Sequence, residues 1–191
     1  MLQIALNAPQ LEVVLAAGEL ACPDCSGPLS RWGFARSREI RTRDGVRSLR
    51  PRRALCAECD TTHVLCPAWS VPRRRDGAQV IGEALRQSAR GDGHRRIARR
   101  LGRPSGTVRG WLRASRSRAE LLRCSGVRWA YVLDPQLGRI ESAGSPLGDA
   151  VEALATASRA WTLRFGAGGC PWELAVALTG GLLHGQPPEP P

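Results

Sequence analysis

The chain has 191 residues and a mass of 20.6 kDa, enough for one ordinary domain or for two or three small ones. All 28 basic residues are Arg, against 17 acidic residues, and the formal net charge is +11 at pH 7. The longest apolar run, 174–183, is about half the roughly 20 residues that a membrane span requires. The first twenty residues hold no basic residue of the kind that begins a secretory signal. We therefore expect a cytoplasmic protein without a membrane span.

The charge is concentrated in the middle of the chain. Residues 31–123 contain 24 Arg against eight acidic residues, a net charge of +16, whereas residues 1–30 and 124–191 carry −3 and −2. A surface that is charged only for solubility would mix the two signs more evenly. Arg also presents a planar fork of donors that binds phosphate in a bidentate way. This distribution predicts a polyanion as partner.

Composition divides the chain into five segments. They are a short N-terminal helix (1–21), a cysteine-rich ribbon (22–70), a helical unit (71–123), a linker with a helical hairpin (124–185) and a proline-rich disordered tail (186–191). The first helix is expected over 9–20, with Leu11, Val14 and Leu15 on one face and Gly18 near its end. The expected fold class is mainly α with a small β zinc ribbon.

Two C-x-x-C pairs lie in the ribbon segment, Cys22-Pro-Asp-Cys25 and Cys56-Ala-Glu-Cys59, and 30 residues separate them. Each pair places two sulfurs on one tight turn, so two pairs complete a tetrahedral thiolate site for Zn²⁺. The separation exceeds the roughly 15–20 residues usual for such sites, but a hairpin turning at Asp44-Gly45 would bring its ends together. The predicted ligands of one structural Zn²⁺ per chain are Cys22, Cys25, Cys56 and Cys59.

Other interpretations of the cysteines fit less well. A reducing compartment and the odd count of seven Cys argue against a disulfide framework, and a redox role for one pair leaves the other unexplained. Gly27, just after the first pair, is expected to supply a positive φ. His63 and Cys66 follow the second pair, and the sequence leaves open whether either joins the metal. For His63, packing beside the site as a strand residue is the favoured interpretation.

Arg residues recur along both arms of the expected hairpin. Arg50, Arg52 and Arg53 belong to the second arm, where alternation would direct one face of the hairpin to phosphate groups. The ribbon has few apolar residues, so we expect metal binding to fold it. A site closed by four protein ligands stabilises structure and leaves no open position for catalysis.

Residues 95–112 have the apolar spacing of a helix-turn-helix. The matching positions are Ile97, Ala98, Leu101, Gly102, Val108 and Trp111. Arg103 departs from this pattern, since the turn often carries an apolar residue there. A helix capped by Asp76, with Gln79 as its capping-box partner, is expected to precede the pair. Together the three helices predict a homeodomain-like trihelical unit; a plain helical hairpin is the structural alternative.

In such a unit the last helix enters the major groove with its N-terminal residues at the base edges. Arg109 is expected to read a base, because bidentate contact between Arg and guanine is the commonest specific contact. Arg95, Arg96, Arg99 and Arg100 are expected to contact phosphates. The predicted DNA-contacting residues are Arg50, Arg52, Arg53, Arg95, Arg96, Arg99, Ser105, Gly106, Thr107, Arg109 and Arg113.

Two helices are expected in the C-terminal segment, after a linker that contains Asp134-Pro135. The first begins at Ser145-Pro146, and the second begins at Pro171. The first carries a heptad-like seam of Leu147, Val151, Leu154, Ser158, Trp161 and Phe165. An intramolecular hairpin of the two helices is slightly favoured; the alternative is a homodimer interface, which would match a two-fold DNA site.

The cysteine pairs, together with Trp32-Gly33, Arg43-Asp-Gly45 and Thr62-His-Val-Leu65, resemble the N-terminal zinc ribbon of certain bacterial insertion-sequence transposases. In those proteins a helix-turn-helix follows at the same place, so the chain is similar to a bacterial, transposase-like family of ribbon plus helix-turn-helix proteins. Such transposases also carry a ribonuclease-H-like domain with an Asp/Asp/Glu triad. Only 68 residues follow position 123 here, and they are typical of helices. No catalytic residue is therefore predicted.

These features predict a non-catalytic, sequence-specific, nucleoid-associated protein that binds double-stranded DNA. It would be a transcriptional regulator or a transposase-derived recognition module. One alternative is an accessory or degenerate transposase subunit that acts with a catalytic partner. A second and less favoured alternative is RNA binding by the ribbon.

Overall fold

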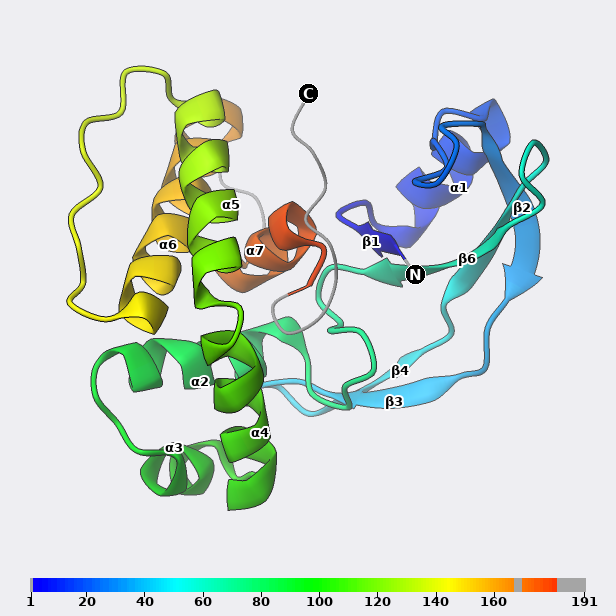
Figure 1. Ribbon diagram of the computed structural model, residues 1–191. Helices are drawn as coiled ribbons and strands as arrows, with labels where there is room; N and C mark the ends of the chain where they lie inside the picture. The colour runs from blue at the N-terminus through cyan, green and yellow to red at the C-terminus, as the bar shows by residue number, and fades with distance from the viewer. Residues whose placement is uncertain (1, 167–169, 182–191) are drawn as a thin grey trace.

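The computed structural model describes residues 2–166 and 170–181 and places a small sheet beside a group of helices (Figure 1). Within these residues there are seven helices and six short strands, so the expectation of a mainly α fold with a small β part is confirmed. The tail predicted at 186–191 lies outside the described residues. No described helix is both long and apolar enough to cross a membrane.

The larger sheet has four strands in the order β1 (Leu2–Ile4), β6 (Thr62–Pro67), β5 (Arg52–Cys56) and β2 (Leu29–Phe34). Strand β5 pairs antiparallel with both β2 and β6, and β1 lies parallel to β6 with Leu2 opposite Leu65. The sequence does not predict β1, because a three-residue strand is too short to show alternation. Its pairing nevertheless ties the start of the chain to the strand that follows the second cysteine pair.

Helix α1 (Ala8–Ala17) begins one residue earlier than predicted. The Asn7 side chain accepts a hydrogen bond from the Gln10 backbone, and the Gln10 side chain accepts one from the Asn7 backbone, which completes a capping box. The helix ends at Gly18, whose φ is 69°. Its buried side chains, Leu11 and Leu15, join the core of the sheet.

A second, two-stranded sheet extends from the first as a hairpin. Strands β3 (Arg38–Arg41) and β4 (Val46–Leu49) pair antiparallel, with Arg41 opposite Val46. The turn lies at the predicted Asp44-Gly45, and Gly45 has a φ of 129°, which side chains rarely allow. Ile40, one residue before the turn end of β3 and opposite Arg47, is fully buried and anchors the hairpin.

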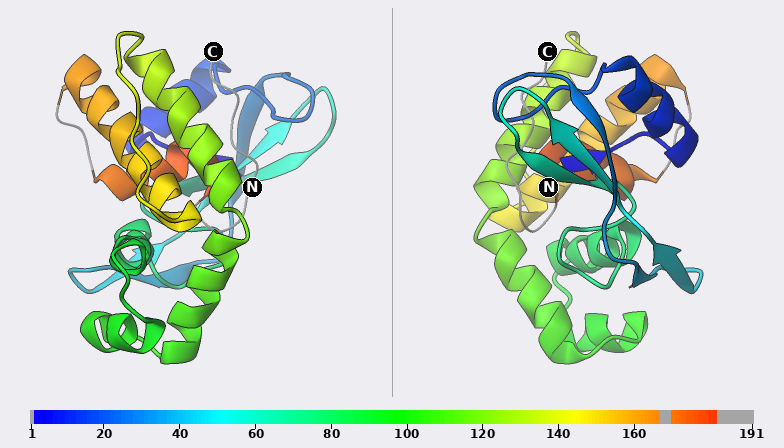
Figure 2. Two further views of the ribbon diagram at one scale, coloured as in Figure 1. Left: turned by 60° about the vertical axis from the view of Figure 1, so that its left-hand side comes forward. Right: turned by 90° about the vertical axis from the view of Figure 1, so that its right-hand side faces the viewer.

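Helices α2 (Ala78–Ala89), α3 (His94–Leu101) and α4 (Ser105–Arg116) pack around one core. That core includes the buried side chains Ile81, Leu85, Ile97, Val108 and Trp111. The expected capping role of Asp76 is wrong, since the residue before α2 is Gly77 and no side chain caps this helix. Seen from further directions, α3 and α4 project from one end of the molecule (Figure 2).

Helices α5 (Ala119–Leu133) and α6 (Pro146–Phe165) run side by side in the same direction, and residues 134–145 return along the pair (Figure 1). Residues 124–133, expected as linker, are therefore helical. The helix ends instead before Pro135, which disfavours a helical conformation at Asp134. The two backbones approach closely at Gly126, where an added Cβ would lie 2.7 Å from the Ala153 backbone.

The start of α6 is as predicted, since Ser145 Oγ accepts a hydrogen bond from the Gly148 backbone at 3.1 Å and Pro146 follows it. Its main partner is α5 rather than α7 (Pro171–Thr179), because Ala150, Ala153 and Ala157 let α5 pack closely against it. α7 lies against α2, α5 and α6. Half of the predicted heptad seam, Leu147, Leu154 and Ser158, is buried within the chain, and the partly buried Val151 packs against the same core as Leu154.

Candidate functional site

The two cysteine pairs come together at one end of the larger sheet. Cys22 and Cys25 lie in the turn between α1 and β2, whereas Cys56 ends β5 and Cys59 lies in the turn before β6. The antiparallel pairing of β2 with β5, with Leu29 opposite Cys56, brings the two turns side by side. The two cysteine pairs, which 30 intervening residues separate, are therefore brought together by the pairing of β2 with β5.

The spacing of the four sulfurs fits a metal ion. Cys22 Sγ lies 3.7 Å from Cys59 Sγ, Cys25 Sγ lies 3.4 Å from Cys56 Sγ, and all four lie within 4.8 Å of one another. A tetrahedron of thiolates with metal–sulfur bonds of about 2.3 Å has edges of about 3.8 Å. Cys22 and Cys56 are buried and the other two cysteines are exposed, so the cluster forms at the edge of the sheet core.

The turns that carry the cysteines differ in one detail from the prediction. The positive φ in the first turn belongs to Ser26, at 64°, and not to Gly27. Gly27 lies close to the opposite turn, since an added Cβ would be 2.5 Å from Oε2 of the exposed Glu58 side chain, which would have to move. Asp60, with a φ of 55°, has the corresponding strained position in the second turn.

The sequence leaves open whether His63 or Cys66 joins the metal site, and the structure places the two residues differently with respect to the cysteine cluster. His63 is buried on β6, and its Nε2 lies 3.4 Å from Cys22 Sγ and 3.8 Å from Asp24 Oδ2. This position suits a hydrogen bond from the ring to a metal-bound thiolate. Cys66 lies outside the cysteine cluster, and its Sγ is 3.8 Å from Arg38 Nη2. Burial raises the pKa of the Cys66 thiol.

Two thiols of the cluster, Cys25 and Cys59, have pKa values shifted in opposite directions by their hydrogen bonds. Hydrogen bonds from the Thr61 side chain and backbone lower the pKa of Cys59 to about 7. The Gly27 backbone lowers the pKa of Cys25, but hydrogen bonds with the Cys56 and Cys59 thiols outweigh it and raise that pKa to about 12. The Cys59 thiolate is therefore readily formed near neutral pH, and metal binding would displace the proton of Cys25.

A buried ion-pair bridge connects the ribbon to the helices, and the sequence does not predict it. Asp76 Oδ2 lies 2.6 Å from Arg41 Nη2 on β3, and Asp76 Oδ1 lies 2.6 Å from Arg103 Nε in the turn between α3 and α4. The Asp76 side chain is only 3% exposed. Arg103, which departs from the usual apolar turn residue, is thus accommodated by a buried carboxylate. That departure is the one signal in the sequence that points to the bridge.

Exposed Arg side chains surround the projecting α3–α4 end. Arg95, Arg99, Arg109 and Arg113 are exposed, and none of them forms an ion pair with another described residue. Arg96 and Arg100 differ, because both pair with Asp92 at the start of α3. In α4 the predicted contact residues Ser105 and Gly106 are exposed and Thr107 is half-buried. No side chain caps the first turn of α4.

The Arg residues predicted on the ribbon arm have three different environments. Arg50 is exposed, with its guanidinium carbon 4.8 Å from the centre of the Phe34 ring. Arg52 donates a hydrogen bond from Nη2 to Glu12 Oε2 at 3.2 Å and also covers Phe34. Arg53 donates to Thr62 Oγ1 at 3.1 Å. Arg52 is therefore held between α1 and β2, and Arg50 is the most accessible of the three.

Residues 22–111 match the model of a family described as a domain of unknown function, DUF6431. The match begins at the first cysteine of the cluster and ends at Trp111 in α4, so it includes the cysteine pairs, the hairpin, α2 and α3. No curated protein and no solved structure matches the chain. The similarity to insertion-sequence transposases remains a resemblance in the motifs.

Proposed function

We propose that this chain is a zinc-stabilised protein that binds double-stranded DNA sequence-specifically and performs no catalysis itself. In this proposal α3 and α4, joined through Gly102, act as a helix-turn-helix. The observation that carries it is a set of exposed Arg residues at the α3–α4 end of the molecule (Figure 2) that form no ion pair with any residue the structure describes: Arg95, Arg99, Arg109 and Arg113. A polyanion that binds these Arg side chains breaks few existing ion pairs, so its binding costs little free energy.

The donor chemistry of the cluster supports Zn²⁺ as the metal. Four thiolates in a compact arrangement suit Zn²⁺ among the divalent ions, and a closed set of four protein ligands is typical of a structural site. The ion would join the turn after α1 to the turn between β5 and β6. Its contribution would be to fold the ribbon, and the proposed DNA contacts would be made by other residues.

The start of α4 supports its assignment as the recognition helix. Gly102 has a φ of 61°, which permits the sharp turn between the helices, and Ile97, Val108 and Trp111 fix their crossing. The backbone N–H groups of the first turn have no side-chain cap, so they can contact phosphate. Arg109 lies one turn further along, where a bidentate contact with guanine is geometrically reasonable.

Selection from a library of random duplexes tests the proposal directly. The zinc-loaded full chain should enrich one sequence motif, with affinity that falls steeply as salt rises.

A homodimer is also proposed, and it would give the motif two-fold symmetry. Leu163 and Phe165, which are 85% and 59% exposed at the end of α6, could form part of its interface. Recovery of unselected sequences at every salt concentration would contradict specific binding.

Arg50 and Arg52 are two positions apart in the sequence, but we expect their replacement to affect DNA binding and stability differently. Arg50→Ala should weaken binding to the selected and scrambled duplexes equally and lower the salt slope by about one, as expected for loss of one phosphate contact. Arg52→Ala removes the hydrogen bond to Glu12 and should mainly lower stability. Titration by fluorescence anisotropy at several salt concentrations, with thermal unfolding of each variant, separates the two effects. An Arg50→Ala protein that loses affinity only for the selected duplex would contradict the assignment.

A further inference from the structure

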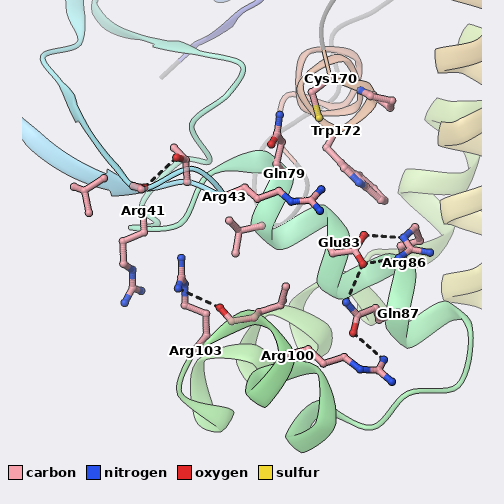
Figure 3. Close-up of a pocket in the computed structure, with 16 residues that line it drawn as sticks. Arg41, Arg43, Gln79, Glu83, Arg86, Gln87, Arg100, Arg103, Cys170 and Trp172 are labelled. Atoms are coloured by element: carbon pink, nitrogen blue, oxygen red, sulfur yellow. Dashed lines mark hydrogen bonds and ion pairs between the residues drawn. The ribbon is translucent and has the colours of Figure 1, made fainter.

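A large cleft lies between the β3–β4 hairpin and the helices (Figure 3), and none of the four cluster cysteines lines it. Its volume is about 960 Å³, and its walls come from the hairpin turn, α2, the end of α3 and the start of α7. This volume is at the upper end of the range for sites that enclose a drug-sized ligand. The cleft is much larger than a single phosphate ion requires.

The charge of the cleft is positive. Five Arg residues line it, Arg41, Arg43, Arg86, Arg100 and Arg103, against a single carboxylate, Glu83. Glu83 accepts hydrogen bonds from Arg86 Nε at 2.7 Å and from Gln87 Nε2 at 2.8 Å. The hydrogen bond from Arg86 is the largest cause of the lowered pKa of Glu83, which is therefore ionised and already neutralised.

Arg43 is the cation in this cleft that is left for a ligand. Arg41 and Arg103 share Asp76, and Arg100 pairs with Asp92, whereas no ion pair among the described residues includes Arg43. Arg43 extends from the hairpin turn over α2, between Gln79 and Glu83 (Figure 3). With the carboxylates of Glu83, Asp76 and Asp92 counted against the five Arg, an excess of two positive charges remains.

The opposite wall of the cleft is apolar and contains a flat ring. Trp172, at the start of α7, stands directly on α2, and a Cβ added at Gly82 would lie 2.0 Å from the indole. Any larger residue at position 82 would collide with the ring, so the indole packs closely against α2. Pro171, Val80 and Leu101 are further apolar residues that line the cleft. The indole is half-buried and lines the cleft, so it offers a surface on which a base can stack.

We propose that this cleft is a nucleotide-binding site, in which Arg43 binds the phosphates and the Trp172 wall contacts the base. Arg forms bidentate hydrogen bonds with phosphate oxygens, and the combination of cations with an aromatic wall distinguishes a nucleotide from an inorganic anion. The site does not depend on DNA binding, because α4 does not line it.

Isothermal titration of the zinc-loaded full chain with ATP, pyrophosphate and adenosine tests the site. ATP should bind with one site per chain, pyrophosphate should bind at least fivefold more weakly, and adenosine more weakly still. Arg43→Ala should weaken ATP binding at least tenfold. The control is Arg128→Ala, because Arg128 is also exposed but lies on α5 outside the cleft. It should bind ATP like the unmodified chain, and circular dichroism should be the same for both variants.

Three results would overturn the proposal. One is absence of ATP binding. If Arg43→Ala then weakens the binding of duplex DNA, the cleft belongs to the DNA interface instead. Another is equal loss of ATP affinity in the Arg43→Ala and Arg128→Ala proteins, which would indicate binding by overall charge. The third is equal affinity for ATP and pyrophosphate, which would exclude a role for the Trp172 wall.

Discussion

Replacing Cys56 with Ser is expected to abolish metal binding and to unfold the ribbon while α2, α3 and α4 remain folded. Cys56 is buried, and its Sγ lies 3.4 Å from that of Cys25, so the change removes one of four ligands at the edge of the sheet core. In zinc-finger peptides the binding free energy of a structural zinc ion is about 10–16 kcal/mol, and it is folding free energy. Elemental analysis of the purified protein should give one zinc per chain for the unmodified protein and almost none for the variant.

Amide hydrogen exchange shows which helices and strands unfold in the Cys56→Ser protein. Protection should be lost in β2, β5 and β6, and it should persist in α2, α3 and α4, whose core contains Ile81, Leu85 and Trp111. Cys124→Ser is the matched control, because Cys124 is exposed on α5 and lies outside the cluster. The Cys124→Ser protein should retain its zinc and the protection of its ribbon amides against exchange. A Cys56→Ser protein with a full complement of zinc, or with an unchanged ribbon, would contradict the metal site.

The second large effect is expected from Asp76→Asn, which keeps the size of the side chain and removes its charge. Arg41 and Arg103 would then lose their shared carboxylate. Breaking a buried ion pair by removing one partner costs roughly 3–5 kcal/mol. We expect about 3 kcal/mol, the lower end, because the Arg41 side chain is 39% exposed while that of Arg103 is 16% exposed. Urea unfolding of the zinc-loaded protein measures this loss.

Glu120→Gln is the control for Asp76→Asn. It also removes a carboxylate that pairs with Arg, but the Glu120 side chain is 72% exposed on α5. Exposed ion pairs contribute little to stability, so its unfolding midpoint should hardly change. Equal midpoints for the two variants would show that the Asp76 bridge does not hold the hairpin to the helices.

The features predicted best are those set by local spacing. Two cysteines three positions apart on a tight turn define a pair of ligands in any surrounding structure, and Asp44-Gly45 defines a hairpin turn. Pro146 and Pro171 likewise fix where α6 and α7 begin, because Pro fits the first turn of a helix. These signals need no knowledge of distant contacts.

The features that the sequence does not predict depend on residues far apart in the chain. Arg41, Asp76 and Arg103 meet only after the hairpin has packed on α2 and on the turn before α4, so Asp76 is easily mistaken for a helix cap. The sequence likewise does not predict which helix packs against α6. The heptad-like seam indicates that α6 has a partner, but the close approach at Gly126 and Ala153 selects α5. Arg52 could not be separated from Arg50 without its contact to Glu12 on α1.

The ratio of affinities for the selected and scrambled duplexes, measured for the unmodified chain and for Arg109→Ala, tests DNA recognition by α4 most directly. We expect Arg109→Ala to cost about 1–3 kcal/mol on the selected duplex and little on the scrambled one, because a guanine edge carries sequence information and a phosphate does not. The ratio should therefore fall roughly 5- to 150-fold. An unchanged ratio, with both duplexes weakened equally, would show that Arg109 contacts only phosphate and that α4 is not the recognition helix.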